Sequence, residues 1–261
     1  MILTVELPQE LLLLLRQAPL RLSAMRSALL TANLEGVWWD LRTAALIDRA
    51  ALTAETALQL GQMLQGARPD LFVAFEPTSE QAFVVNRRFL QARLEDERLV
   101  YVDVGGSAPD ILSGPPSPVA ALIRSLADHP AKEPLCTLDL GSTPDHSHLI
   151  TLSGFLLDYA VAYVASGHAQ RNCLGGRDLY LIEAFLITPK EQRNNLFSFS
   201  YPAELVSTHK DSPLFAPEDV VEAAKIQLAA RFAKAQTKEA ELSGFRLEVQ
   251  HSTVSLDQVA L

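Results

Sequence analysis

The chain has 261 residues, of which 48% are hydrophobic and 20% are charged, and its formal net charge is −9. This composition is too apolar for a disordered chain, and a chain of this length buries a core without disulfides or metals. The excess of acid argues against nucleic acid and anionic membranes as partners, because both are usually bound through clustered lysines and arginines. We therefore expect a globular protein that binds neither.

Cysteine usage and the N-terminal segment indicate an intracellular protein. Cys136 and Cys173 cannot build a disulfide framework for a chain of this size, so we expect two reduced, mostly buried thiols. The apolar run 11–15 is preceded by acidic residues, whereas a secretory signal has basic ones there. Neither this run nor the apolar stretch 149–164 reaches the roughly 20 residues that a bilayer requires. A cytoplasmic or otherwise intracellular, non-secreted location is expected.

Helices and strands alternate in the first half of the chain. Proline and glycine positions delimit two N-terminal helices, one over 8–18 and a second that ends at Gly36. A third helix, capped by a threonine, covers 53–65, and a fourth ends near Ala127. The second and third of the predicted strands form a hairpin. Short apolar runs predict these strands at 37–41, 71–75, 82–85, 99–104 and 135–140.

The second half is predicted to be antiparallel. The apolar stretch 149–164 fits either a buried helix or a buried strand, because periodicity does not separate the two. Strands are expected at 178–187 and at 196–201, where aromatic residues alternate with serines. A long helix over 217–244 follows, ended by a glycine, and a last strand covers 245–249.

These elements predict an α/β protein of the mixed α+β type. We expect one largely buried mixed sheet with helices on its faces and an antiparallel C-terminal half. The proline-rich loop 109–118 is the one candidate boundary between domains. Because neither side of it shows an independent core, the chain is expected to form a single domain over residues 1–261.

Three stretches of the chain resemble a known family. They read SGFLLDYAVAYV at 153–164, NCLGGRDLYLIEAFLI at 172–187 and LFSFSYP at 196–202. In this order they are similar to an uncharacterised eukaryotic family, a domain of unknown function known from a human chromosome-1 open reading frame. The sequence departs from the family pattern at Ala160 and at Arg177-Asp178, where that pattern has prolines. The resemblance implies no activity.

A candidate site lies at the ends of two predicted strands. The chain has no P-loop, no dinucleotide fingerprint, no nucleophile elbow and no zinc-protease motif. Asp40 and Asp103 each end an apolar run, and Gly105, Gly106 and Ser107 follow the second. The two carboxylates could hold Mg²⁺ or act as acid and base, and the glycine amides could cradle a phosphate. The alternative is that both aspartates only cap turns.

Two weaker candidates involve histidine and cysteine. On an extended segment His146 and His148 would face the same side, which suits a metal ion. A third ligand would be needed, from Cys136 or His168. Cys173 could act as a nucleophile if a neighbouring cation lowered its pKa. The alternatives are a polar loop for the histidines and a small buried hydrophobe for the cysteine.

Two further polar groups are more typical of solvated surfaces. Ser198, Ser200 and Tyr201 could line a pocket, but a solvated strand face is the favoured interpretation. The last long helix carries four cations opposite its apolar stripe, and a solvated helix face is expected for them. These cations are Lys225, Arg231, Lys234 and Lys238.

Two functions fit this pattern. The first is a protein that binds a small phosphate- or nucleotide-like ligand at the strand ends. If Asp40 and Asp103 converge on Mg²⁺, this protein would be a metal-assisted hydrolase. The second is a non-catalytic interaction or scaffold protein. Trp38, Trp39 and the aromatic strand around Phe197 would then form a homodimer or partner interface, where aromatic residues are enriched.

Overall fold

The computed structural model describes residues 8–257 apart from 19, 21–22, 49, 142–146, 166–171 and 209–214. Its helices are α1 (Gln9–Gln17), α2 (Ala24–Trp38), α3 (Ala54–Ala67), α4 (Arg87–Leu94), α5 (Ser117–Ala127), α6 (Ser147–Leu156), α7 (Glu204–Thr208) and α8 (Pro217–Gln236). Its strands are β1 (Ala44–Leu46), β2 (Leu71–Glu76), β3 (Gln81–Asn86), β4 (Val100–Asp103), β5 (Asp110–Leu112), β6 (Leu135–Thr137), β7 (Val161–Val164), β8 (Asp178–Ile187), β9 (Arg193–Pro202) and β10 (Arg246–Ser255).

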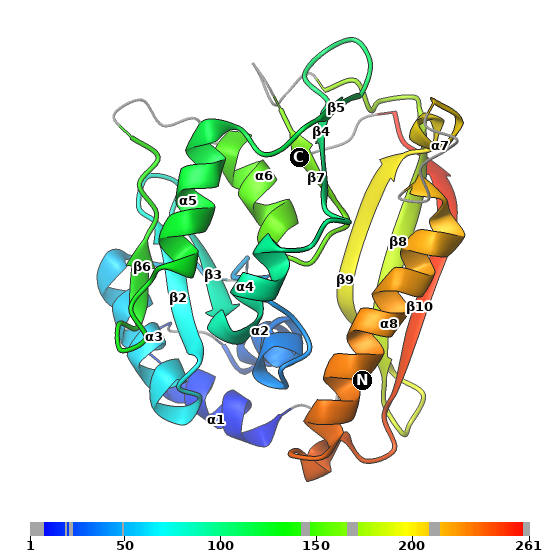
Figure 1. Cartoon of the computed structure of the whole chain (residues 1–261). Coiled ribbons are helices and arrows are strands. Elements are labelled where there is room, and N and C mark those ends of the chain that lie inside the picture. The colour runs from blue at the N-terminus through cyan, green and yellow to red at the C-terminus, as the bar shows by residue number, and fades with distance from the viewer. Residues whose placement is uncertain are drawn as a thin grey trace.

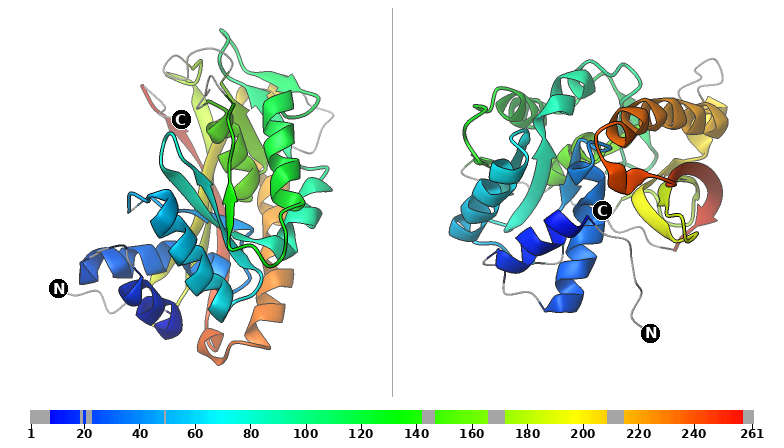
Figure 2. Two further views of the ribbon diagram at one scale, coloured as in Figure 1. Left: turned by 90° about the vertical axis from the view of Figure 1, so that its left-hand side faces the viewer. Right: turned by 90° about the horizontal axis from the view of Figure 1, so that it is seen from below.

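The mixed α+β class is confirmed, but within the described residues the strands form three sheets instead of one. Their orders are β1-β3-β2-β6, β5-β4-β7 and β10-β8-β9. The third sheet is antiparallel throughout, as predicted for the C-terminal half, and β2 and β3 form the predicted hairpin. Helix α8 lies along a face of the third sheet (Figure 1), and the view from below keeps the two side by side (Figure 2).

The predicted strand at 37–41 is wrong, because helix α2 continues to Trp38. Gly36 does not end the helix; its carbonyl oxygen accepts from the backbone amides of Leu41 and Arg42 at 2.8 and 3.0 Å. These two bonds close the helix end and turn the chain, with Asp40 in the left-handed region at φ 59°. Aspartate tolerates this conformation better than most residues. The strand that follows, β1, is short and begins only at Ala44.

The ambiguous apolar stretch 149–164 contains both a helix and a strand. Helix α6 ends at Leu156, and β7 begins at Val161. Asp158 makes the turn between them in the left-handed region, at φ 61°. A Cβ atom at Gly154 would lie 2.7 Å from the Cβ of Ala162, so glycine lets the helix lie against the strand. A turn of four residues therefore divides what hydrophobicity alone presents as one segment.

Helix α8 is shorter than predicted. It ends at Gln236, because the carbonyl oxygen of Ala235 accepts from the amides of both Lys238 and Glu239 at 2.9 Å. Gly244, at φ 79°, instead precedes β10, which continues to Ser255 and is longer than the predicted last strand. Neither α8 nor any other described helix combines the length and apolarity that crossing a membrane requires.

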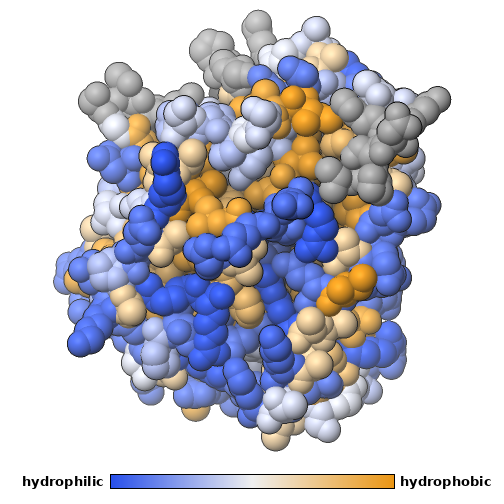
Figure 3. Space-filling model, viewed as in Figure 1, coloured by the Kyte–Doolittle hydropathy of each residue, from blue (hydrophilic) through white to orange (hydrophobic). Residues whose placement is uncertain are grey.

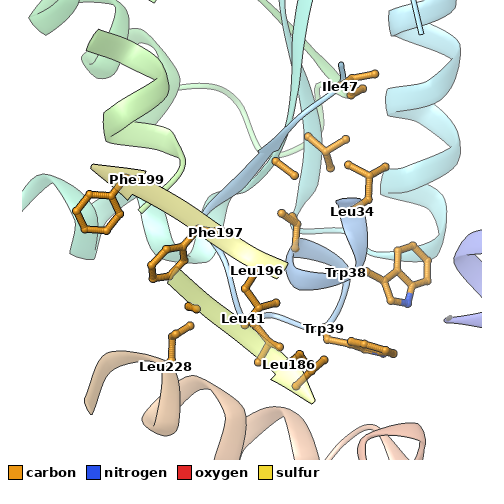
Figure 4. Close-up of a cluster of buried hydrophobic side chains, with 14 of the residues drawn as sticks. Leu34, Trp38, Trp39, Leu41, Ile47, Leu186, Leu196, Phe197, Phe199 and Leu228 are labelled. Carbon is orange, nitrogen blue, oxygen red and sulfur yellow. The ribbon is translucent and has the colours of Figure 1, made fainter. Parts of the chain in front are cut away.

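One large buried cluster joins the N-terminal helices to the C-terminal sheet. It includes Leu34, Trp39, Phe197 and Leu228, which come from α2, the turn after it, β9 and α8 (Figure 4). Burial of such side chains contributes about 1.5–3 kcal/mol each. The cluster contains residues from both sides of segment 109–118, in which β5 and the start of α5 lie. The single-domain assignment stays a prediction that this packing favours.

Two glycines of α3 provide a matched test of this packing. A Cβ atom at Gly61 would lie 2.2 Å from the carbonyl oxygen of Pro134, whereas one at Gly66 would have no neighbour within 4 Å. We expect Gly61→Ala to lower the free energy of unfolding by about 1–3 kcal/mol through overpacking. Gly66→Ala should raise it by about 0.5–1 kcal/mol, because alanine is the better helix former. Urea unfolding measures both, and equal effects would contradict the close approach of α3 and Pro134.

Candidate functional site

A cavity of about 230 Å³ lies where α8 meets β9, the α4–β4 connection and the segment between α6 and β7. Figure 1 shows the elements that contribute its lining, among them α4, β9 and α8, and Figure 3 shows that hydrophobic residues are exposed in the upper middle of the same face. The residues that line the cavity are Arg93, Asp96, Arg98, Asp158, Ala160, Phe197, Phe199, Asp219, Val220, Ala223, Ala224, Gln227, Leu228 and Arg231.

The wall of the cavity is mainly apolar. Phe197 and Phe199 come from β9, where alternation places both on one side of the strand. Figure 4 shows Phe197 extending from β9 toward Leu228 of α8. Phe199 also stacks on Tyr159, with ring centroids 5.2 Å apart. A wall of aromatic and aliphatic side chains with a few polar groups is typical of small-molecule sites.

The floor of the cavity holds a buried carboxylate, Asp158. Its Oδ2 accepts from the backbone amide of Thr43 at 2.7 Å, and its Oδ1 accepts from the Thr43 hydroxyl at 2.6 Å. Arg231 donates to the same two oxygens at 3.1 and 3.4 Å. Burial by itself raises the pKa of Asp158, but the charges of Arg231 and Arg93 and the Thr43 bonds outweigh burial and hold the pKa below its ordinary value. The carboxylate is therefore ionised at neutral pH.

Arg231 lies on the buried side of α8, so its assignment to a solvated face is wrong. It follows Leu228 by three residues and precedes Ala235 by four, which places all three on one helix face. Besides Asp158, it donates to the carbonyl oxygen of Leu41 at 2.9 Å, and its guanidinium lies 4.1 Å from the centre of the Phe89 ring. Spacing against the apolar stripe was the signal in the sequence that could have identified it.

Arg93 is the second buried cation of the cavity, with 2% of its side chain exposed. Its Nε donates to the carbonyl oxygen of Phe155 at 2.9 Å, and its Nη2 donates to the carbonyl oxygen of Tyr159. Its Nη1 pairs with Asp96 at 3.1 Å. Burial lowers the pKa of Arg93, but a guanidinium stays protonated at any physiological pH. The sequence offered no motif for this residue, because its partners are backbone carbonyls of a distant turn.

The structure does not bring the predicted strand-end residues into this cavity. Asp40 lies in the turn after α2 and accepts from Asn86 Nδ2 and Arg88 Nη1, each at 2.7 Å. Asp103 does end β4, whose neighbours are β5 and β7, and its Oδ1 accepts from the Gly105 amide at 2.8 Å. The Gly105 bond is that of an aspartate that caps a turn.

The anion cradle that was expected after β4 is an exposed turn in the structure. Gly106 and Ser107 are exposed, and the carbonyl oxygen of Ser107 accepts from Arg177 Nη2 at 2.8 Å. Asp40 belongs to the region beside the four-stranded sheet, while Asp103 belongs to the sheet β5-β4-β7. Parallel adjacent strands carrying both carboxylates, which that site required, are not formed in the described part of the chain.

The metal and thiol candidates gain no structural support. His146 and His168 lie outside the described residues, and His148 is in the first turn of α6. Among the residues that the structure describes, no three of the types His, Cys, Asp and Glu are grouped so as to hold a metal ion. Cys136 is buried, and burial raises rather than lowers the pKa of the Cys173 thiol. A thiolate nucleophile is therefore disfavoured.

The aromatic residues that were predicted to form a partner interface are buried in the protein. Trp38 and Trp39 are each 2% exposed and Phe197 is 5% exposed. Tyr201 is buried and donates to the carbonyl oxygen of Phe215 at 3.0 Å, whereas Ser198 and Ser200 are half-buried. Alternation along β9 was thus predicted correctly, but its aromatic face packs against this chain's own core and cavity.

Comparison with known proteins gives a family and no activity. A family model described as a domain of unknown function, DUF4504, matches residues 13–261. The chain therefore belongs to this family, and the resemblance seen in its sequence is confirmed. No match to the chain was found among the curated proteins or the solved structures.

Proposed function

We propose that this member of the DUF4504 family binds a small organic molecule in the cavity beside α8. The observation that carries the proposal is the combination of an apolar wall with convergent charged groups at one place. A cavity of about 230 Å³ has room for such a ligand, since an apolar cavity of roughly 150 Å³ admits benzene.

Binding is better supported than catalysis. The described lining contains no serine, cysteine, histidine or lysine that could act as nucleophile or base. Its best-placed carboxylate, Asp158, is fully engaged by Thr43 and Arg231. A hydrolase that uses Mg²⁺ and a phosphate-like substrate at Asp40 and Asp103 remains the alternative, but the first of these carboxylates is already paired with Arg88.

A variant that fills the cavity tests the proposal. Ala223 lines the cavity, whereas Ala230 is exposed on the same helix. We expect a ligand from a screen of small aromatic and aliphatic compounds to stabilise the wild type by about 2.7 kcal/mol at a hundred times its dissociation constant. Ala223→Leu should abolish this stabilisation, and Ala230→Leu should keep it. Ligand-detected NMR and thermal unfolding measure the two effects.

The same screen separates the two candidate sites. With a ligand in the α8 cavity, Asp103→Asn leaves binding unchanged, because Asp103 is not among the cavity residues of the described chain. A ligand that is lost in Asp103→Asn but retained in Ala223→Leu would refute the cavity and support the strand-end site. Retention in both variants would place the ligand elsewhere and would equally contradict the proposal.

A further inference from the structure

The geometry points to a small apolar carboxylic acid, bound as its anion, as the ligand class of the α8 cavity; this inference rests on the proposed function. Its basis is an imbalance between hydrogen-bond acceptors and donors among the charged residues of the lining. Three arginines and three aspartates line the cavity, so net charge does not decide the ligand's sign. What decides it is which of these groups still has bonding capacity.

The inner carboxylates have little capacity left for a cationic ligand. Asp158 accepts four hydrogen bonds, two from Thr43 and two from Arg231, which matches the roughly four lone-pair positions of a carboxylate. Asp96 accepts from Arg93 Nη1 at 3.1 Å and from the backbone amide and Nε of Arg98 at 3.2 and 3.0 Å. A ligand ammonium group would have to displace one of these arginines.

Arg98, in contrast, still has hydrogen-bond donors available for a ligand. Only its backbone amide and its Nε bond to Asp96, so both terminal amino groups of its guanidinium have no hydrogen-bond acceptor in the described part of the chain. Its side chain is 47% exposed and lines the cavity. Two terminal amino groups on one guanidinium match the two oxygens of a carboxylate, which they bind in a bidentate manner.

Asp219 is the one lining carboxylate that is exposed, and it lies in the first turn of α8. A carboxylate there stabilises the helix through the helix dipole. Its negative charge also repels an anionic ligand through solvent. Removal of this charge should therefore change the affinity for an anion in a direction that an experiment can detect. The apolar part of the ligand, a ring or a short alkyl chain, would contact Phe197, Val220 and Leu228 in the cavity.

Three probes that differ only in their head group test the ligand class. They are 3-phenylpropanoate, 3-phenylpropanamide and 3-phenylpropylamine, with dissociation constants measured by NMR titration of the full chain. We expect 3-phenylpropanoate to bind most tightly. Arg98→Gln should weaken it by about three- to tenfold and leave the amide unchanged, because only the anion gains from the guanidinium. Arg246→Gln, an exposed arginine away from the cavity, is the matched control.

Asp219→Asn should have the opposite effect to Arg98→Gln, because it should tighten the binding of 3-phenylpropanoate. Equal affinity for acid and amide, or tightest binding of the amine, would overturn the carboxylate class. If such binding is still abolished by Ala223→Leu, the proposed cavity function stands. Failure of all three probes to bind would count against both the ligand class and the cavity, because the probes match its apolar wall and its size.

Discussion

Asp158→Asn lowers the free energy of unfolding by about 3 kcal/mol or more, as expected for removing one partner from a buried ion pair. Only 3% of the Asp158 side chain and 9% of the Arg231 side chain are exposed. The variant leaves Arg231 buried without its counter-ion, beside the buried Arg93 and Arg42. Asparagine accepts the left-handed backbone at this position, so backbone strain does not contribute to the loss.

Urea unfolding at several pH values measures this effect and its electrostatic origin. The folded state holds the pKa of Asp158 below its ordinary value, so its contribution is present above about pH 4 and is lost as the pH falls through the folded-state pKa. The difference between wild type and Asp158→Asn should therefore be constant from pH 6 to 8 and shrink in acid. A difference that keeps its full size as the pH falls below about 4 would mean that shape, not charge, is responsible.

Two further variants complete this experiment. Asp110→Asn, at an exposed position of β5, is the control and should change stability by less than about 0.5 kcal/mol. Adding Arg231→Met to Asp158→Asn should recover part of the loss, because it removes the uncompensated charge. Simple additivity of the two substitutions would contradict a direct coupling between these residues.

Local patterns in the sequence predicted the elements whose environment is local. The hairpin β2–β3, the long strand β8 and the alternation along β9 follow from runs of apolar residues and the turns between them. The prediction at 37–41 failed, because an apolar run after a glycine looks like a strand while the same residues also continue a helix stripe. Only the tertiary contacts of Trp38 and Trp39 settle which pattern applies.

The cavity could not be predicted from the sequence, for a different reason. Asp158 is separated in sequence from Thr43 by 115 positions and from Arg231 by 73. No motif connects residues so far apart, and a single aspartate in an apolar stretch resembles a turn residue, which Asp158 also is. The acids that the sequence did suggest, Asp40 and Asp103, end apolar runs in the same way, so strand-end position alone does not separate a binding carboxylate from a turn cap.

Glu35→Gln should make the protein more stable than the wild type at pH 8, by about 4 kcal/mol. Glu35 is fully buried in α2, where its Oε2 accepts from Asn194 Nδ2 at 3.3 Å and its Oε1 has no partner among the described residues. Burial raises the pKa of this carboxyl to about 8, although the Asn194 bond acts in the opposite direction. The folded protein therefore holds a proton at pH 7 that the unfolded chain has released.

The sign of the pH dependence follows from this proton. Between about pH 4.5 and pH 8 the folded state binds more protons than the unfolded state, so stability falls as the pH rises through this window. Glutamine resembles the protonated carboxyl and does not titrate. The difference between Glu35→Gln and the wild type should hence be small at pH 4–5, grow by about 1.36 kcal/mol for each pH unit above that, and level off above pH 8.

Urea unfolding from pH 4.5 to pH 8.5 measures this difference directly, and Glu97→Gln on the exposed α4–β4 connection is the control that should leave the profile unchanged. Parallel profiles of wild type and Glu35→Gln would show that Glu35 is already ionised in the folded protein. A buried cation would then have to neutralise it, and Arg42, whose side chain lies against the neighbouring Gly36 and whose Nε has no partner in the described part of the chain, is a candidate. A diverging profile instead identifies a neutral acid in the core, whose deprotonation limits the stability of this protein in base.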